Sequence, residues 1–258
     1  MLCTLALLAS PTLCLAAPDH EQLGRWIHDA ENVLRGKTSA AVVSMKIKKA
    51  SYERDYELMV YTDDRASSSK VLMRMLGPAL WRGNATLKVA ERISFFDPRT
   101  SRITVMGSTM LGENWMGSHF TNDDLMRETD LARHYQYRLL NTSSSKDESG
   151  DPVTQQLIEL TPLPQAPVAW AKVLYRLNIG ADQRALPLSV EYFRRQDDAK
   201  PARTLEYAGL KLIEQRKLPT RLTMSPSDAP GEFTRIEYRK LKFDVSFAAD
   251  DFSERAFR

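Results

Sequence analysis

The chain has 258 residues, of which 43% are hydrophobic and 27% charged, values typical of a soluble globular protein with one domain or a tight pair. Its 36 basic and 33 acidic residues give a net charge of only +3, so the composition does not favour a nucleic-acid-binding protein. Both cysteines, Cys3 and Cys14, lie near the start of the chain, which excludes disulfides, thiolate catalysis and cysteine-ligated metals from residues 18–258.

Residues 1–17 form an uncharged apolar run that ends in the small residues Ala16 and Ala17. This pattern is typical of a secretory signal peptide, although the run lacks the usual basic residue at its start. A buried N-terminal helix is the alternative. The residues before Cys14 match a lipoprotein signal poorly. We therefore expect a signal peptide over residues 1–17 and one exported domain over residues 18–258.

A helix is predicted over residues 21–35, and after it the hydrophobic period changes from about 3.6 to two. The helix is indicated by Leu23, Trp26, Ile27, Ala30, Val33 and Leu34, with Gly36 as a stop signal. Alternating runs, typical of strands with one apolar face, follow at residues 43–47, 56–60, 85–89, 93–95, 103–105, 135–139, 173–179, 188–192 and 241–247.

Turn-forming residues separate these runs, and the most polar segment, Asn141 to Pro152, is predicted to be a mobile hairpin loop. The fold class is therefore mainly β (α+β): one strongly curved antiparallel sheet that forms an incomplete barrel closed by a few helices. Three segments are available as covers: residues 21–35, the stretch around residues 111–129, and a turn near residues 164–170. Helices inside such a barrel would leave a cavity in which an apolar ligand could lie.

The stretch LGENWMGSHFTNDDLMRET, residues 111–129, contains a helix start and a lid candidate. Thr121 and Asp124 have the spacing of a capping box, and Phe120 and Leu125 that of a hydrophobic staple. This spacing explains the acidic residues structurally, without a catalytic role. Trp115 and Met116 lie between two glycines, which suits a flexible lid over an apolar pocket, whereas plain filling of the core is the alternative.

Arg54 shares strand parity with Tyr56 and Leu58, so it is expected to point toward the apolar face and to bond the covering helices. The alternative is that Arg54 lies at a strand end and extends to water. The sequence contains no GxSxG, GxGxxG, Walker or HExxH motif, and its histidines lack metal-ligand spacing. We therefore expect no enzyme, no metal and no cofactor.

The segment WMGSHFTNDDL, residues 115–125, closely resembles the WMGSDFTNDDL-type signature of the LolA-like outer-membrane lipoprotein-sorting family. The surrounding context, ERDYELMVYTDD, MLGPALWRGNATLKV, FFDPRTSRITVMG and a closing DDFSERAF, is similar in kind and order. His119 departs from the usual acidic residue, and ISFFDP stands where a WLYLP-type strand is common. In LolA an inward strand arginine bonds the lid helices, and Arg54 has the matching placement and parity here.

The resemblance implies a periplasmic, monomeric carrier that holds acyl chains of a lipoprotein or lipid in an apolar cavity and passes them towards the outer membrane. Its implied partners are the acylated cargo, an inner-membrane transporter as donor and an outer-membrane acceptor, with no nucleic acid. A lipid or lipoprotein sensor on the same fold, which signals to a membrane partner, is the alternative. The residues expected to contact lipid are Trp115, Met116, Phe120, Leu125, Phe95, Tyr56, Leu58 and Tyr175, with Arg54 as the lid latch.

Overall fold

The computed structural model describes residues 18–66, 69–126 and 131–257, so the expected signal peptide lies outside the described residues. The helices are α1 His20–Glu31, α2 Asn122–Met126 and α3 Leu131–His134, and short 3₁₀ turns span Ala79–Trp81, Ser108–Met110, Trp115–Gly117, Ala249–Phe252 and Glu254–Phe257. The strands are β1 Thr38–Lys49, β2 Tyr52–Asp63, β3 Lys70–Gly77, β4 Ala85–Val89, β5 Arg92–Asp97, β6 Arg102–Val105, β7 Tyr135–Lys146, β8 Pro152–Pro162, β9 Lys172–Ile179, β10 Ala185–Phe193, β11 Arg203–Ile213, β12 Arg216–Pro226 and β13 Phe233–Phe243.

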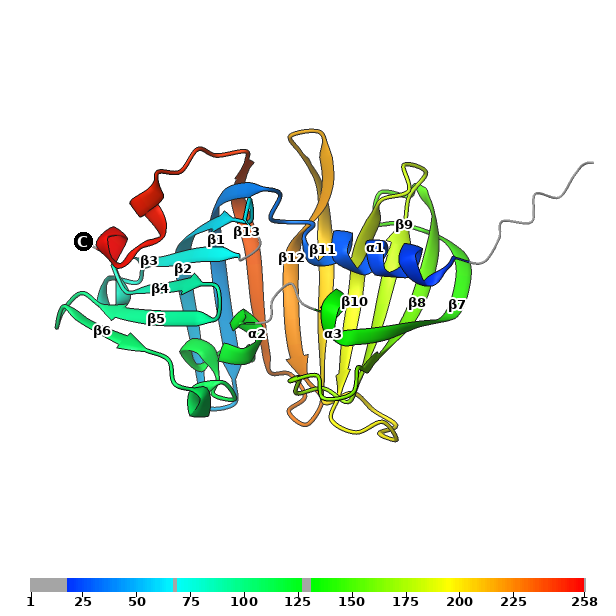
Figure 1. Cartoon of the computed structure of the whole chain (residues 1–258), viewed down its shortest axis with the longest axis horizontal. Helices are drawn as coiled ribbons and strands as arrows, with labels where there is room; N and C mark the ends of the chain where they lie inside the picture. Colours follow the sequence, from blue (N-terminus) through cyan, green and yellow to red (C-terminus); the bar gives the residue numbers. More distant parts are fainter. Residues whose placement is uncertain (1–17, 67–68, 127–130, 258) are drawn as a thin grey trace, which may run out of the picture.

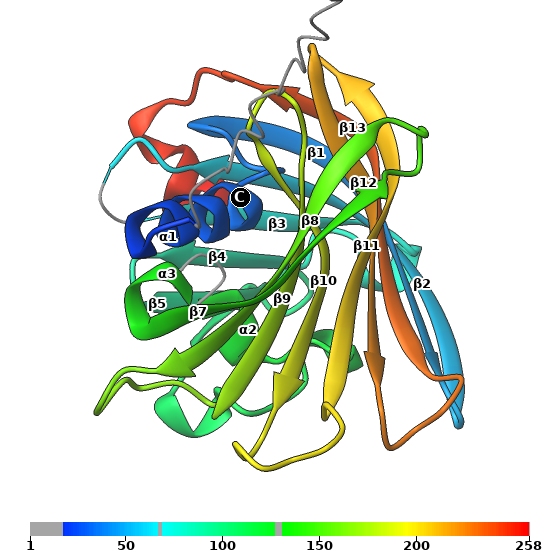
Figure 2. The same ribbon diagram turned by 90° about the vertical axis from the view of Figure 1, so that its right-hand side faces the viewer.

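All these strands form one antiparallel sheet in the order β6-β5-β4-β3-β2-β1-β13-β12-β11-β10-β9-β8-β7. The sheet is strongly curved, and α1, α2 and α3 lie on its concave side (Figures 1 and 2). β6 and β7 follow one another in the chain yet form the two opposite edges. The chain between them therefore has to pass from one edge to the other, and we call its described residues, 106–126 and 131–134, the lid segment. The predicted incomplete antiparallel barrel is confirmed.

Helix α1 forms because a capped start precedes one apolar face. The Asp19 carboxylate accepts a hydrogen bond from the Gln22 backbone N–H at 2.8 Å, which caps the first turn. Leu23, Trp26 and Ile27 are buried against the sheet. The helix ends at Glu31, earlier than the predicted residue 35. The residues from 32 to 35 continue the apolar pattern as turns, which explains the overestimate.

Two apolar clusters fill the concave side. One joins α1 to strands β7 to β12, and the other joins β1, β2 and β3 to the lid segment. In β9 the predicted alternation is complete, because Val173, Tyr175, Leu177 and Ile179 are all buried. In β1 the same holds for Val43, Met45 and Ile47.

A third cluster lies on the opposite, convex face of the sheet. The strand register pairs Leu72 with Leu87, so both point away from Met73, which lines the concave side. The two C-terminal 3₁₀ turns cover this face, and the Phe257 ring stacks on Phe96 with the ring centroids 5.0 Å apart. The predicted apolar run at residues 85–89 therefore faces the C-terminal segment and not the cavity.

Four strands, β3, β8, β11 and β12, and most of β13 were not predicted from the sequence. β3 lacks clean alternation because apolar clusters cover both of its faces, so Leu72 and Met75 are buried on opposite sides. In β11 charged and apolar residues are mixed on both faces. β12 does alternate, with Leu218, Leu222 and Met224 opposite Lys217, Arg221 and Thr223, so this strand was overlooked. The last strand begins at Phe233, although the sequence pattern is regular only from residue 241.

The polar segment Asn141 to Pro152 is not the loop that the sequence suggested. Its first residues extend β7 to Lys146, and the turn to β8 is docked on the β11–β12 hairpin. The Glu148 carboxylate accepts hydrogen bonds from the backbone N–H groups of Gly209 and Leu210 at 2.8 and 2.9 Å. Gly209 has φ of 70° at a point where the ladder skips a residue, which frees these donors. The β7–β8 turn is therefore hydrogen-bonded to β11 at one end of the curved sheet.

Replacing Glu148 by alanine should lower the free energy of unfolding by about 1 kcal/mol, because two bonds to a charged acceptor are lost at an exposed site. Urea denaturation of the purified protein measures this change. Glu206, an exposed carboxylate on β11, provides the matched alanine control and should give no more than a few tenths of a kcal/mol. Equal effects of the two substitutions would show that the Glu148 bonds do not stabilise the curved sheet.

Candidate functional site

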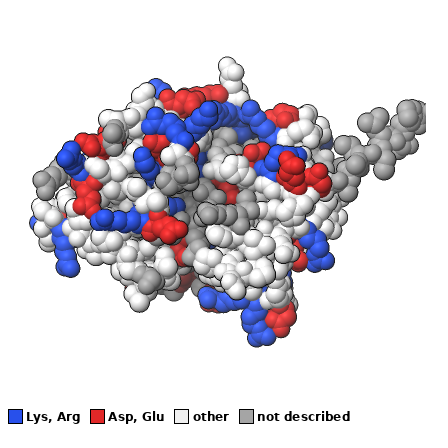
Figure 3. Space-filling model, viewed as in Figure 1, with Lys and Arg blue, Asp and Glu red and all other residues white. Residues whose placement is uncertain are grey.

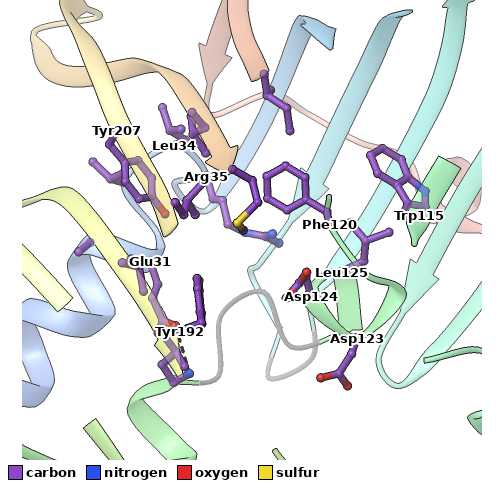
Figure 4. A pocket seen from close by; sticks show the side chains of 18 of the residues that line it. Glu31, Leu34, Arg35, Trp115, Phe120, Asp123, Asp124, Leu125, Tyr192 and Tyr207 are labelled. Carbon is purple, nitrogen blue, oxygen red and sulfur yellow. Dashed lines mark hydrogen bonds between the residues drawn. The ribbon is translucent and has the colours of Figure 1, made fainter. Parts of the chain in front are cut away.

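A cavity of about 240 Å³ lies between the concave face of the sheet and the lid segment (Figure 4). Its wall is mainly apolar and comes from three parts of the chain: α1, the inner face of the sheet and the lid segment. The principal lining residues are Ala30, Val33, Leu34, Val43, Met45, Leu58, Val60, Met73, Trp115, Phe120, Leu125, Tyr175, Val190, Tyr192, Leu205, Tyr207, Leu222, Met224 and Ile236.

Five of the residues predicted to contact lipid line this cavity, namely Leu58, Trp115, Phe120, Leu125 and Tyr175. The other three, Tyr56, Phe95 and Met116, belong to the cluster of β1, β2 and β3 next to Trp115. Their packing supports the wall without forming part of its lining. Contact of any of these eight residues with lipid stays a prediction.

The predicted capping box is present at the start of α2. The Asp124 carboxylate accepts from the Thr121 backbone N–H at 2.7 Å, and the Thr121 hydroxyl accepts from the Asp124 backbone N–H at 3.2 Å. Phe120 and Leu125, expected to form a staple, pack against different clusters of the sheet, one on the α1 side and one on the β1–β3 side. In Figure 4 both side chains extend toward the cavity.

Asp124 also bonds Arg203, the first residue of β11, which was not singled out from the sequence. The guanidinium donates to both carboxylate oxygens, with Nη1 to Oδ2 at 2.7 Å, and also to the His119 carbonyl at 3.2 Å. The Arg203 side chain is only 8% exposed and packs against the adjacent rings of Trp170 and Tyr192, at 4.5 and 4.8 Å from their centroids. Burial lowers its pKa, but the bonded carboxylate outweighs that effect and the pKa is raised.

The sequence offers one signal for Arg203. It shares strand parity with the buried Leu205, so its side chain leaves the strand on the concave face. At the start of a strand, however, an arginine normally extends to water. The aromatic rings against which it packs come from the β8–β9 loop and from β10, and no local pattern connects them to β11.

Arg54 does not hold the position that the sequence predicted for it. It is exposed, lies near the start of β2 and does not line the cavity, so the expected inward latch on the covering helices is wrong. Its guanidinium stacks on the Tyr52 ring at 4.4 Å from the centroid. The Tyr52 hydroxyl donates to the Gly117 carbonyl at 2.7 Å, and a Cβ on Gly117 would lie 3.8 Å from the Arg54 Nη1, so Arg54 lies beside the lid segment without a polar bond to it.

His119 attaches the other side of the lid segment to β13. Its backbone N–H donates to the Thr234 hydroxyl at 2.9 Å, its Nδ1 lies 2.9 Å from the same oxygen, and its Nε2 lies 3.2 Å from a Glu232 carboxylate oxygen. Burial lowers the pKa of His119; Glu232 opposes this shift, whereas Lys49 adds to it. Glu232 is itself fixed by the Ala50 backbone N–H at 2.7 Å.

Close backbone approach fixes the tryptophan turn of the lid segment. Met116 and Gly117 have φ of 53° and 73°, in the left-handed region, so the chain reverses immediately after Trp115. A Cβ on Gly117 would lie 2.9 Å from the Tyr52 hydroxyl oxygen, so only glycine fits without a shift. The lid segment is thus held at β2 by Tyr52, at β11 by Arg203 and at β13 by Thr234.

Replacing Arg203 by methionine should lower the free energy of unfolding by about 2–4 kcal/mol. This is less than the loss of ~3–5 kcal/mol expected when one partner of a fully buried ion pair is removed, because the Asp124 side chain is 21% exposed. Amide exchange in residues 111–126 should accelerate at the same time. The double variant Arg203→Met with Asp124→Asn should recover part of the loss, since no carboxylate is then left unpaired. Arg221→Met, at an exposed site on β12, is the control and should leave exchange in the lid segment unchanged.

The lid segment should also loosen in acid. In the closed lid the His119 pKa lies below its ordinary value of about 6.5, whereas in an open, solvated lid it returns to that value. The closed state is therefore fully favoured above about pH 6.5 and loses stability as the pH falls through the lowered pKa. Amide exchange of residues 111–126, corrected for its intrinsic pH dependence, should show this loss between pH 7.5 and 5. An unchanged pH profile in His119→Asn would contradict the assignment.

Among residues 18–66, 69–126 and 131–257, no cluster of three or more histidine, cysteine, aspartate or glutamate side chains is arranged to hold a metal ion. No helix within those same ranges combines the length and the apolar character needed to cross a bilayer. Charged side chains are interspersed in sign on the face shown in Figure 3.

Comparison with known proteins places the fold. A DUF1329 family protein from Desulfovibrio piger has a TM-score of 0.76 at 17% identity, with 93% of this chain and 100% of that chain covered. An outer membrane lipoprotein-sorting protein domain from Vibrio parahaemolyticus has a TM-score of 0.70 at 20% identity, with 90% of this chain and 96% of that chain covered. A LolA superfamily protein from Nitrosomonas europaea has a TM-score of 0.69 at 20% identity, with 93% of this chain and 100% of that chain covered. These similarities show a LolA-like fold, as predicted from the sequence.

A family model described as "Uncharacterized protein" matches residues 67–258. No curated protein sequence matches the chain.

Proposed function

Because the chain belongs to the family whose model matches residues 67–258 and has the LolA-like fold, we propose that it is a periplasmic carrier of acyl chains. It binds the chains of a lipoprotein or lipid in the cavity under the lid segment and passes them towards the outer membrane. The observation that carries this proposal is the apolar cavity itself, which the connection between the two sheet edges covers.

The chemistry of the lining supports binding without covalent chemistry. Most of the wall consists of aliphatic and aromatic side chains, which attract acyl chains by removing apolar surface from water. The charged groups at its rim are bonded to other parts of the protein. Arg35 forms a two-bond pair with Asp64, and Asp124 forms one with Arg203. Groups held in this way position the lid and the helix end, and they are poorly placed to act as nucleophile or base.

The size of the cavity implies that the lid segment moves when cargo enters. About 240 Å³ is below the ~300–1,000 Å³ of typical ligand pockets. Phe120, Leu125 and Trp115 all contribute to the lining from the lid segment, so its displacement would enlarge the space (Figure 4). A few polar contacts hold the lid segment to β2, β11 and β13. Open and closed states that differ by only a few such bonds can exchange during loading and release.

A donor and an acceptor complete the proposed cycle. Acyl chains leave a membrane at high cost, so a carrier would receive them from an inner-membrane transporter and give them to an outer-membrane acceptor. Native mass spectrometry of the protein extracted from its own periplasm tests the proposal, with bound acylated molecules as the expected result. Cargo-free protein in the cytoplasm would refute it. A stable complex with a membrane protein and no transfer of lipid would indicate a sensor on the same fold.

Filling the cavity should abolish lipid binding while the fold is retained. Val60 lines the cavity and is partly buried, so Val60→Trp would place an indole in the space for acyl chains. We expect at least a tenfold loss of affinity for a fluorescent fatty-acyl probe. Val105→Trp, on the convex face of β6 where Val105 is 48% exposed, is the matched control and should bind normally. Both melting temperatures should stay within a few degrees of wild type, and normal probe binding by Val60→Trp would exclude this cavity.

A further inference from the structure

The cavity has two chemically different halves. Along β1, β2 and β3 its lining side chains are all aliphatic, namely Val43, Met45, Leu58, Val60 and Met73. Along β7, β9, β10 and β11 each strand instead contributes a tyrosine, namely Tyr135, Tyr175, Tyr192 and Tyr207. In Figure 4 two of these tyrosines and Glu31 lie on one side of the cavity, across from Trp115 and Leu125. The aliphatic half suits the chain of a lipid, and the tyrosine half offers polar groups that a chain alone does not use.

The tyrosine hydroxyls differ in their partners. The Tyr135 hydroxyl donates to the Trp170 carbonyl at 3.1 Å, and the side chains of Tyr175 and Tyr207 are hydrogen-bonded to each other. For the Tyr192 hydroxyl no hydrogen bond is found to any residue in 18–66, 69–126 and 131–257. Tyr192 therefore brings into the lining a polar group that the rest of the described protein does not engage.

The Tyr192 hydroxyl is a neutral donor in a fixed position. In the strand register Tyr192 lies opposite Arg203, and its ring centroid is 4.8 Å from the guanidinium carbon. Burial raises the pKa of Tyr192 well above its ordinary value, and Tyr207 adds to this shift, so the hydroxyl keeps its proton at neutral pH. Because an O–H group among apolar side chains is costly without an acceptor, a ligand that supplies one is favoured there.

The charges around the cavity favour an acceptor without charge. The carboxylates of Glu31, Asp123 and Asp124 belong to the lining, and the guanidinium of Arg35, which lines the cavity too, already forms a two-bond pair with Asp64. The carboxylate of a free fatty acid would therefore approach groups of its own charge. The carbonyl oxygen of an ester or amide accepts a hydrogen bond and carries no net charge.

We propose that Tyr192 determines the specificity of the cavity by donating a hydrogen bond to the carbonyl of a neutral acyl ester or amide. The inference rests on the proposed function and narrows its cargo, because free fatty acids and alkyl ethers lack such a neutral carbonyl. The bond places the acyl carbonyl at the tyrosine half and the chain against the aliphatic half, so the ligand has one orientation in the cavity.

The test compares three uncharged lipids of equal chain length as competitors of a fluorescent fatty-acyl ester: monooleoylglycerol, oleoylethanolamide and oleyl glyceryl ether, which has no carbonyl. The wild type should bind the ester and the amide about fivefold more tightly than the ether, the effect of one neutral hydrogen bond. Tyr192→Phe keeps the ring and should bind all three as the wild type binds the ether. Tyr238→Phe is the matched control, because Tyr238 lines the cavity from β13 opposite Val43, and it should keep the preference.

Equal binding of ester and ether by the wild type, or a full preference in Tyr192→Phe, would overturn the assignment. Tighter binding of oleate than of monooleoylglycerol would show that the site takes an anion. Infrared spectra of bound, isotope-labelled monooleoylglycerol give a direct readout: the carbonyl stretch should lie at lower frequency in the wild type than in Tyr192→Phe, and identical frequencies would exclude the bond. Failure of every lipid to compete would instead refute the proposed function, a result distinct from binding without preference.

Discussion

The order of the strands imposes one constraint on the whole structure. β6 and β7 are consecutive in the chain but lie at opposite edges of a curved sheet, so the residues between them must span its open side. The lid segment is thus an obligatory connection and not an insertion. Its position over the apolar concave face follows from topology, and its sequence has only to make that position stable.

Stability comes from contacts that are few and distributed. Hydrophobic packing places Trp115 and Leu125 against the β1–β3 side and Phe120 against the α1 side, while polar bonds attach the lid segment to β2, β11 and β13. Asp124 has two roles, because the carboxylate that caps α2 also receives Arg203. The start of the helix and the wall of the barrel are therefore coupled through one side chain.

Local chemistry explains what could be predicted from the sequence. The capping box of Thr121 and Asp124, α1 and the alternating strands depend on neighbours in the chain, so their residues carry the signal directly. Arg203 could not be assigned, because its partners are brought together only by the curvature of the sheet. Arg54 was misplaced for the converse reason: its parity is that of the inner face, but the strand end lies beyond the cavity. β3 was not predicted because apolar clusters cover both of its faces, so its apolar residues do not alternate with polar ones.

The connection between the two edges gives the sheet a mechanical property. Because one segment of the chain connects the two edges of the curved sheet, the distance between β6 and β7 and the extension of the lid segment change together. Under the proposed function, cargo that spreads the strands would draw the two edges apart and pull on the lid segment at β6 and at β7. A partner that touches either edge strand could then sense whether the interior is full without touching the interior at all.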